Sequence, residues 1–401
     1  MVPWPANELK RFPREHFGPV QTHGFVFGDQ AQGAQGNVVH IPARELGRGV
    51  FGTVRPARMR TCNDDTMVAK TFERHPDSVD RATAVWNEYN VSCMLKHENI
   101  VACFGAMLST VSPVLYFERV DGINLAQHFM NETSGGRFYC EDKLRRIFTN
   151  LLEAFHYLQT ARIVHLDLKA ENVMIKTNGL AKLIDFGCAR SFAEGKPMVI
   201  RPDMHTHPPE INLPSMGGVD QKADIFFCGS LLYILATKFP YPFGMVHGMT
   251  VAEQDIHLRR KVYKRYIGYC RISQELKTLI DDMTAYDPRQ RPDAAYCLQN
   301  PWFMRSPGYQ EPVLKNHQDR RYPRTAAELD DALLTQMAQC LQVSKCGLTG
   351  IILRNRASWV AIAYQANLHR KNNPIAAASA SAASSPAAST SAASASLAPR
   401  R

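Results

Sequence analysis

The stretch VHLDLKAENVMI, residues 164–175, constrains the fold and chemistry of this chain more than any other part of the sequence. Apolar residues surround five polar ones, namely His165, Asp167, Lys169, Glu171 and Asn172. One explanation is a polar turn, because Asp and Asn are common turn residues. The other is a loop that holds a metal ion and accepts a proton. Partner residues elsewhere in the chain favour the second explanation.

A further acidic group, Asp185, follows a strand-like run in AKLIDFG. Phosphoryl transfer requires placed metal ions, a placed nucleophile and neutralised charge, but little covalent chemistry from the protein. Asp185 and Asn172 are suitable oxygen ligands for Mg²⁺, which keeps several waters and takes few protein groups. Asp167 would then orient the accepting hydroxyl and take its proton. Lys169 would stabilise the transferred phosphoryl group.

A glycine-rich segment, LGRGVFGTV at residues 46–54, has Gly47, Gly49 and Gly52 in GxGxxG spacing. This spacing alone also occurs in dinucleotide-binding folds, where the glycines open a helix. Here extended residues and a proline follow, which favours a hairpin. Such a hairpin would bring backbone N–H groups over phosphate oxygens, with Phe51 at its tip. A simple glycine-rich hairpin without a ligand is the alternative.

A lysine and a glutamate complete the set of candidate functional residues. The segment MVAK places Lys70 at the end of a predicted strand, where a lone lysine normally points to solvent. Glu88 follows 18 residues later, within a segment of helical spacing at residues 77–96. If that helix packs on the strand, the carboxylate would hold the ammonium group at the α- and β-phosphates of a nucleotide.

Together these motifs resemble the eukaryotic protein kinases, and in particular their serine/threonine branch. The resemblance runs from about Ile41 to Phe303 and rests on GxGxFGxV, VAK, HxDLKxEN and DFG in one order. Further similarities are HPPE, which ends at Glu210, and DIFFCG, which starts at Asp224. In that family the position of Arg291, in DPRQRP, pairs with the position of Glu210.

The resemblance implies an α+β, two-lobed kinase domain over residues 41–303, with a strand-rich N-lobe at 41–119 and a helical C-lobe at 120–303. Residues 1–40 are rich in Pro, Gly and Gln, and we expect them to be irregular. Residues 304–371 are expected to be partly helical. The Ala/Ser-rich residues 372–401 are expected to be disordered, because they have little to bury.

The resemblance also implies ATP and Mg²⁺ as cofactors, bound in the cleft between the lobes. Val54, Ala69 and Met174 would sandwich the adenine. Phe117 would be the gatekeeper, followed by a hinge at residues 118–120 whose backbone reads the adenine edge. The complete set of predicted nucleotide-binding residues is Leu46, Gly47, Gly49, Phe51, Gly52, Val54, Ala69, Lys70, Phe117, Glu118, Val120 and Met174.

Some positions depart from the family pattern. Leu166 replaces the arginine that often reads a phosphate on the activation segment, and Asp203 replaces a threonine that contacts the catalytic loop. The only hydroxyl residues between DFG and PPE are Ser191 and Thr206. We therefore predict activity that does not depend on phosphorylation of the activation loop. Lys169 favours Ser or Thr over Tyr as the phosphate acceptor.

Two small residues near the predicted helix leave an alternative function open. Ser92, four residues after Glu88, stands where a large apolar side chain is usual, and Cys103 is expected at a neighbouring position. Both bury little apolar area, so the active arrangement would be weakly held. The alternative is a pseudokinase scaffold that binds nucleotide or partners without efficient catalysis. HPPE, DIFFCG and Arg291 argue against a small-molecule kinase. The departures together also resemble kinases carried by large DNA viruses.

The C-terminal region carries most of the excess charge. Of the net charge of +10, +7 lies from Arg305 onward, which supports attraction to anionic partners without identifying one. Thr325 and Glu328 have capping-box spacing and predict a helix over residues 325–347. This helix would pack on the large lobe or bind a partner.

Bulk composition excludes several classes of protein. There is no run of about 18 apolar residues and no signal-peptide pattern, so we expect no membrane insertion. The 10 cysteines lack metal-binding or disulfide spacing, which indicates a reduced, intracellular protein, cytoplasmic or nuclear. The expected partners are proteins with Ser or Thr acceptors; nucleic acid is not expected, and the sequence leaves the oligomeric state open.

Overall fold

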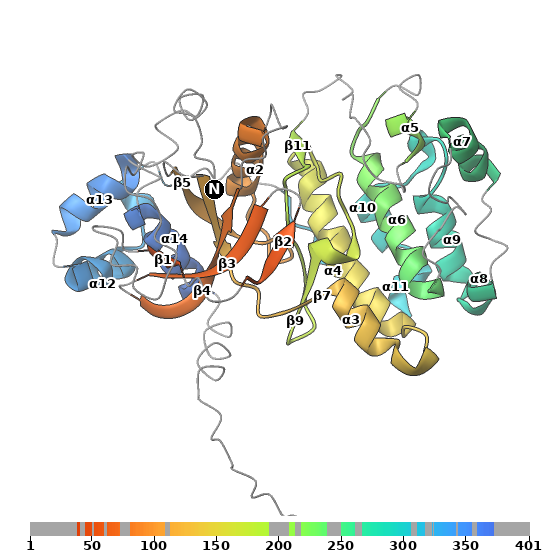
Figure 1. Cartoon of the computed structure of the whole chain (residues 1–401), viewed down its shortest axis with the longest axis horizontal. Coiled ribbons are helices and arrows are strands. Elements are labelled where there is room, and N and C mark those ends of the chain that lie inside the picture. Colours follow the sequence, from red (N-terminus) through yellow and green to blue (C-terminus); the bar gives the residue numbers. More distant parts are fainter. Residues whose placement is uncertain are drawn as a thin grey trace, which may run out of the picture.

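The predicted two-lobed α+β fold is confirmed: strands build the first lobe and helices build most of the second (Figure 1). The computed structural model describes residues 38–40, 45–49, 52–59, 62–72, 81–108, 113–191, 208–212, 218–238, 250–260, 267–305, 311–316, 323, 325–341, 344–354 and 359–372.

The small lobe is an antiparallel sheet with one long helix. Its described strands are β1 (Val38–His40), β2 (Gly47–Gly49), β3 (Gly52–Met59), β4 (Cys62–Thr71), β5 (Cys103–Leu108) and β6 (Pro113–Glu118). They run in the order β1-β3-β4-β6-β5, with β2 paired to β3. Helix α2 (Arg81–Met94) lies between β4 and β5 in the chain, and it contacts β5.

Strand β1 corrects one prediction about the N-terminal extension. Residues 1–40 were expected to be irregular, but Val38 and His40 pair with Met59 and Ala57 on the edge of the sheet. The apolar, β-branched pair Val38 and Val39 suits an extended backbone. The rest of the extension lies outside the described residues.

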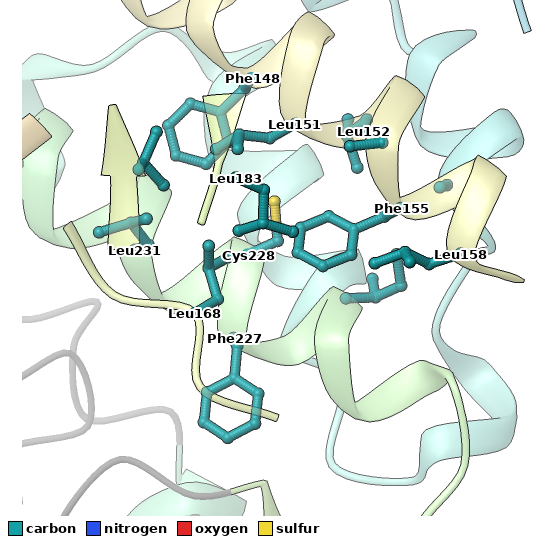
Figure 2. Packing of buried hydrophobic residues seen from close by; sticks show 14 of the residues in the cluster. Phe148, Leu151, Leu152, Phe155, Leu158, Leu168, Leu183, Phe227, Cys228 and Leu231 are labelled. Carbon is teal, nitrogen blue, oxygen red and sulfur yellow. The ribbon is translucent and has the colours of Figure 1, made fainter. Parts of the chain in front are cut away.

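The large lobe is predominantly helical. Its described helices are α3 (Leu125–Glu132), α4 (Glu141–Thr160), α5 (Pro209–Asn212), α6 (Lys222–Thr237), α7 (Val251–Arg260), α8 (Ile267–Arg271), α9 (Gln274–Met283), α10 (Ala294–Leu298) and α11 (Pro301–Met304). Apolar residues recur at helical spacing along α4 and are all buried: Leu144, Ile147, Phe148, Leu151, Leu152, Phe155 and Leu158. Figure 2 shows Leu151 and Phe155 of α4 beside Leu183 and Cys228, the latter on α6, at the centre of this lobe.

Short strands in the large lobe flank residues 165–172, which are called the polar loop below. β7 (Gly122–Asn124), β9 (Val173–Lys176) and β10 (Ala181–Leu183) form a sheet in the order β10-β9-β7. β8 (Ile163–Val164) pairs with β11 (Arg190–Ser191). The polar loop therefore starts directly after β8 and ends at β9.

The C-terminal extension forms three helices, α12 (Asp331–Leu341), α13 (Lys345–Arg354) and α14 (Trp359–Asn372). The prediction of one helix over 325–347 was wrong. Thr325 does hydrogen-bond Glu328, but Thr325 precedes a short 3₁₀ turn, Ala326–Glu328, of which Glu328 is the last residue. The helix begins after Asp330, whose carboxylate accepts the N–H of Leu333 and so acts as the N-cap.

Two further outcomes concern the end of the chain. Asn372 ends α14 and is therefore not part of a disordered tail, while residues 373–401 lie outside the described residues. Within the part of the chain that the structure describes, the helices are too short or too polar to cross a bilayer.

Candidate functional site

The predicted pairing of Lys70 with Glu88 is present in the structure. Strand β4 carries Lys70 near its end, and α2 packs so that Glu88 faces it. The Lys70 ammonium donates to both carboxylate oxygens, with Nζ 2.7 Å from Oε1 and 3.0 Å from Oε2. Both residues are buried. Because a buried charge is costly without a partner, this geometry fixes the position of α2 against the sheet.

Asp185 joins the same ammonium group from the other lobe. Its Oδ1 lies 2.8 Å from Lys70 Nζ and also accepts the N–H of Gly187 at 3.2 Å. Asp185 has a left-handed backbone, with φ of 64°, a conformation that Asp tolerates better than most residues. Its side chain is 30% exposed, compared with 1% for Glu88. The cluster is therefore closed on the α2 side and open on the Asp185 side.

The electrostatics of the cluster favour a charged lysine. Burial lowers the pKa of Lys70, but Glu88 and Asp185 together outweigh burial and hold this pKa above its ordinary value. The same interaction acts in reverse on Asp185, whose pKa burial would raise but which the Lys70 ammonium holds below its ordinary value. An open carboxylate that stays ionised is suited to binding a cation.

Asp167, Lys169 and Asn172 are brought together in the polar loop. The Lys169 ammonium donates to both Asp167 oxygens at 3.0 and 2.8 Å. Asn172 Nδ2 donates to the backbone oxygen of Asp167 at 2.8 Å and to its Oδ2 at 2.9 Å. The 3₁₀ turn Ala170–Asn172 places Asn172 back over Asp167. Because the amide nitrogen serves Asp167, the amide oxygen is left to bind a cation.

Leu166 holds a strained backbone next to Asp167. Its φ is 65°, a left-handed conformation that costs a residue of this type about 1–2 kcal/mol. The buried Asp224 carboxylate, on α6, accepts the N–H groups of His165 at 2.8 Å and Leu166 at 2.9 Å. Sequence reasoning noted Asp224 as a family motif but assigned it no role. Its role here is to hold the backbone that presents Asp167.

His165 connects the polar loop to the strand end that carries Asp185. Its Nδ1 lies 3.3 Å from the N–H of Asp167, and its Nε2 lies 3.3 Å from the backbone oxygen of Ile184. A neutral imidazole that is protonated on Nε2 satisfies both contacts, and burial lowers the pKa of His165. The ring also meets the edge of Phe186, with centroids 4.9 Å apart. His165 thus fixes the spacing between the Asp167 and Asp185 segments.

The glycine-rich segment forms the predicted hairpin. Gly47 pairs with Val54, and Gly49 pairs with Gly52. A side chain at Gly52 would place its Cβ 2.3 Å from the Thr71 backbone oxygen, so this close approach of β3 to β4 requires glycine. Phe51, predicted at the hairpin tip, lies outside the described residues, as do Asp203 and Thr206.

Several predicted nucleotide-binding residues share the face of the sheet that carries Lys70. Val54 lies opposite Lys70 in the β3–β4 pair, and Phe117 of β6 lies opposite Val68 of β4. Directly paired residues of an antiparallel sheet project on the same face. Leu46 is exposed before the hairpin, while Val120 and the β9 residue Met174 are half-buried at the border of the large lobe.

The prediction for Ala69 was wrong. Side chains alternate along a strand, so Ala69 faces away from Lys70. It is fully buried on the opposite face, in a core with Tyr116 and with residues of α12 and α14. Val68, two residues before the lysine, is the β4 residue on the Lys70 face. Counting back two positions from Lys70 would have identified Val68 from the sequence alone.

The amino-acid sequence of this chain matches a known family. The family described as protein kinase domain matches residues 41–303, which is more than half of the chain. The chain belongs to the protein kinase family. Its membership accounts for the order of the motifs and for the two lobes that join Lys70, Glu88 and Asp185.

Three curated relatives are kinases by name. A probable serine/threonine-protein kinase, fhkE, of Dictyostelium discoideum is 28% identical over 64% of this chain and 37% of its own length. Sperm motility kinase Z of Mus musculus is 32% identical over 54% of this chain and 42% of its own length. A probable myosin light chain kinase of Dictyostelium discoideum is 26% identical over 68% and 77%. The chain thus spans less than half the length of the first two. None of the three is viral, so the resemblance to viral kinases stays a prediction.

Protein kinases generally use ATP with Mg²⁺, and the residues present fit both. The open carboxylate of Asp185 and the amide oxygen of Asn172 are hard oxygen ligands. Among the described residues no group of three or more His, Cys, Asp or Glu side chains could hold a metal. A carboxylate and an amide oxygen suit Mg²⁺, whose coordination is normally completed by waters and phosphate oxygens.

Proposed function

We propose that the chain is a serine/threonine protein kinase that transfers the γ-phosphoryl group of Mg-ATP to hydroxyl groups of proteins. The observation that carries this proposal is the position of Lys70, which is bound at once by Glu88 of the small lobe and Asp185 of the large lobe. In this family the pair between this lysine and the helix glutamate, and the placement of the DFG aspartate on Mg²⁺, are both required for activity.

Each residue of the site then has a defined task. Bound ATP supplies the phosphoryl group, and Mg²⁺ offsets its charge. Lys70 orients the α- and β-phosphates, and Asp185 and Asn172 hold the cation. Asp167 orients the acceptor hydroxyl and takes its proton as the oxygen–phosphorus bond forms and the bond to the leaving diphosphate breaks. Lys169, which lies against Asp167, stabilises the charge on the transferred group.

Specificity for Ser and Thr is proposed from Lys169 and from the names of the relatives. We also propose that activity does not depend on phosphorylation of the activation segment. Leu166 has no charge with which to bind a phosphate. Instead, Asn87 of α2 donates to the backbone oxygen of Ala189 at 2.6 Å, which connects the helix to the start of that segment.

The alternative of a non-catalytic scaffold has one observation in its favour. Ser92 of α2 is buried, and its hydroxyl has no hydrogen-bond partner among the described residues. An unsatisfied buried hydroxyl costs about 1–3 kcal/mol, which weakens the packing of α2. Cys103 on β5 is half-buried. The complete set of Lys70, Glu88 and Asp185 contacts argues against this alternative.

Labelled transfer to a mixed Ser, Thr and Tyr peptide library tests the proposal. The full chain with Mg-ATP should label Ser and Thr peptides, both before and after phosphatase treatment. Lys70→Met should reduce labelling by at least about 100-fold. Lys143→Met, which removes an exposed lysine paired with Glu132, is the matched control and should retain activity. Nucleotide binding without any transfer would instead support the scaffold.

A further inference from the structure

The three C-terminal helices cover the outer face of the small-lobe sheet, on the side away from Lys70. In Figure 1 α12, α13 and α14, in blue, lie at the small-lobe end of the molecule, and α14 contacts β5. The shared core contains, from the sheet, Ala57, Met67, Ala69, Phe104, Val114 and Tyr116, and from the C-terminal extension Leu329, Leu333, Leu334, Met337, Ala338, Leu348, Ile352, Tyr364 and Ala366. The helices lie beyond the matched kinase domain, so this cover is an addition to it.

Between the kinase domain and these helices, a segment of the chain contacts both lobes. In the segment 311–316, the N–H of Val313 donates to Glu153 of α4, 3.2 Å away. Two residues later Lys315 lies 2.6 Å from Glu98, in the loop between α2 and β5. The extension therefore runs from the large lobe to the small lobe before its helices begin.

Glu118 joins the extension to the segment proposed to bind the adenine. It ends β6 and pairs with Met67, so its side chain projects on the outer face. Its backbone N–H donates to the Ala102 oxygen at 2.9 Å. The buried carboxylate has Lys182 Nζ 2.6 Å from Oε1 and, from α14, His369 Nε2 2.9 Å from Oε2.

Lys182 and His369 together offset the burial of this carboxylate. Burial would raise the pKa of Glu118, but His369 and Lys182 outweigh burial and hold it below its ordinary value. Lys182 is itself buried and also donates to the Ile100 oxygen at 3.2 Å, so its position is fixed. The His369 ring rests against Phe104, with centroids 5.5 Å apart. The contact from α14 is therefore packed as well as polar.

We propose that α14 is a positioning element of the nucleotide site, and that His369 fixes Glu118 and thereby the backbone of residues 118–120. His369 is a positioning residue, because it lies behind the strand and acts through Glu118. The inference rests on the proposed function, since residues 118–120 bind adenine only if the cleft takes ATP. It adds that nucleotide affinity depends on a helix outside the kinase domain.

Nucleotide affinity of three variants of the full chain tests this proposal. His369→Leu keeps apolar packing on Phe104 but removes the imidazole nitrogen that lies 2.9 Å from Glu118 Oε2, and it should weaken Mg-ADP binding by roughly 2- to 30-fold. The turnover number at saturating ATP should change less than about 2-fold, because Asp167 and Asp185 are untouched. His369→Gln retains a donor and should recover most of the affinity. Lys371→Ala, on the same helix, removes only the exposed pair with Asp330 and should bind as wild type.

Amide exchange of residues 118–120 provides a second measurement in the same variants. Exchange at these residues should be faster in His369→Leu than in Lys371→Ala. Wild-type affinity and wild-type exchange in His369→Leu would overturn the inference while leaving the proposed function intact. A wild-type chain that binds no Mg-nucleotide would overturn both. A loss of affinity that is equal in His369→Leu and Lys371→Ala would show general destabilisation and contradict the specific role of His369.

Discussion

Two of the buried ion-pair clusters among the described residues, Arg291–Glu210 and the cluster around Lys70, have similar chemistry but different surroundings. In the large lobe, Arg291 forms two bonds to Glu210, with Nη1 2.6 Å from Oε1 and Nη2 2.8 Å from Oε2. Both side chains are 0% exposed. The other guanidinium N–H groups donate to backbone oxygens of Ala285, Lys222 and Tyr286. All donors are satisfied, so no capacity remains for a ligand.

The cluster around Lys70 is also buried, but it has an open side at Asp185. The difference separates two uses of buried charge. A closed, fully bonded pair holds segments together, and here it joins the start of α5 to the loop before α10. An open cluster keeps a charged group available, which phosphoryl transfer requires. Exposure on one side, more than burial or pairing, distinguishes the functional cluster from the structural one.

The largest expected effect is the loss of stability when the Arg291–Glu210 pair is broken. Arg291→Met leaves Glu210 buried without a partner and should lower the free energy of unfolding by about 3–5 kcal/mol. Urea denaturation measures this loss. The double variant Arg291→Met/Glu210→Leu should recover part of it, because the unpaired charge is gone. A loss below about 1 kcal/mol in the single variant would contradict the structural role.

In the open cluster around Lys70, a substitution should reduce activity strongly and stability only slightly. Asp185→Asn should reduce phosphoryl transfer by about 10²–10³-fold, since a cation ligand and its charge are lost. Its effect on the free energy of unfolding should be smaller than about 1 kcal/mol, because the side chain is partly exposed and solvent can replace its contacts. Steady-state kinetics and urea denaturation of the same preparation separate the two effects. A variant with full activity but reduced stability would reverse the assignment.

A smaller effect is expected from acid, through a third buried group. Burial lowers the pKa of His97 to about 4, below its ordinary value of 6.5. In the unfolded chain His97 takes up a proton near pH 6.5, while in the folded chain it remains neutral, so the contribution of His97 to stability falls between about pH 6.5 and 4, by about 3 kcal/mol. The difference in the free energy of unfolding between wild type and a His97 variant across this range isolates this contribution, because the raised pKa values of Glu88 and Asp224 act in the opposite direction.

His97→Asn is the test variant, because its amide oxygen can replace the imidazole Nδ1 that accepts the Asn99 N–H. The free energy of unfolding of this variant should fall less than that of wild type between pH 6.5 and 4. Arg291→Met should have a lower free energy of unfolding than wild type but the same dependence of it on pH, since Arg291 and Glu210 belong to a separate cluster. Equal slopes in wild type and His97→Asn would show that another group is responsible.

Much of the fold and of the candidate site could be predicted from local sequence. The apolar residues of α4 follow helical periodicity, which is visible in the sequence, and their positions are buried. The pairing of Lys70 with Glu88 followed from motif order and is present at hydrogen-bond distance. These features depend on short-range spacing and on a frequently used arrangement of lobes, which the family pattern encodes.

Other features depend on packing between distant segments. The cover of α12–α14 on the sheet was not predicted, because the helical pattern does not show which surface a helix meets. A signal was present in β6, where apolar residues run without alternation from Val114 to Phe117. Such a run indicates a strand buried on both faces. The same reasoning separates Val68 from Ala69, whose side chain lies in the core with the C-terminal helices.

The most direct test of the central claim compares transfer of labelled phosphate by wild type and by Asp167→Asn. Asp167→Asn keeps the size of the side chain but removes the proton acceptor beside Lys169. Transfer should fall by about 10²–10⁴-fold while Mg-nucleotide affinity is retained. Equal transfer by both proteins, or no transfer by wild type, would contradict the account.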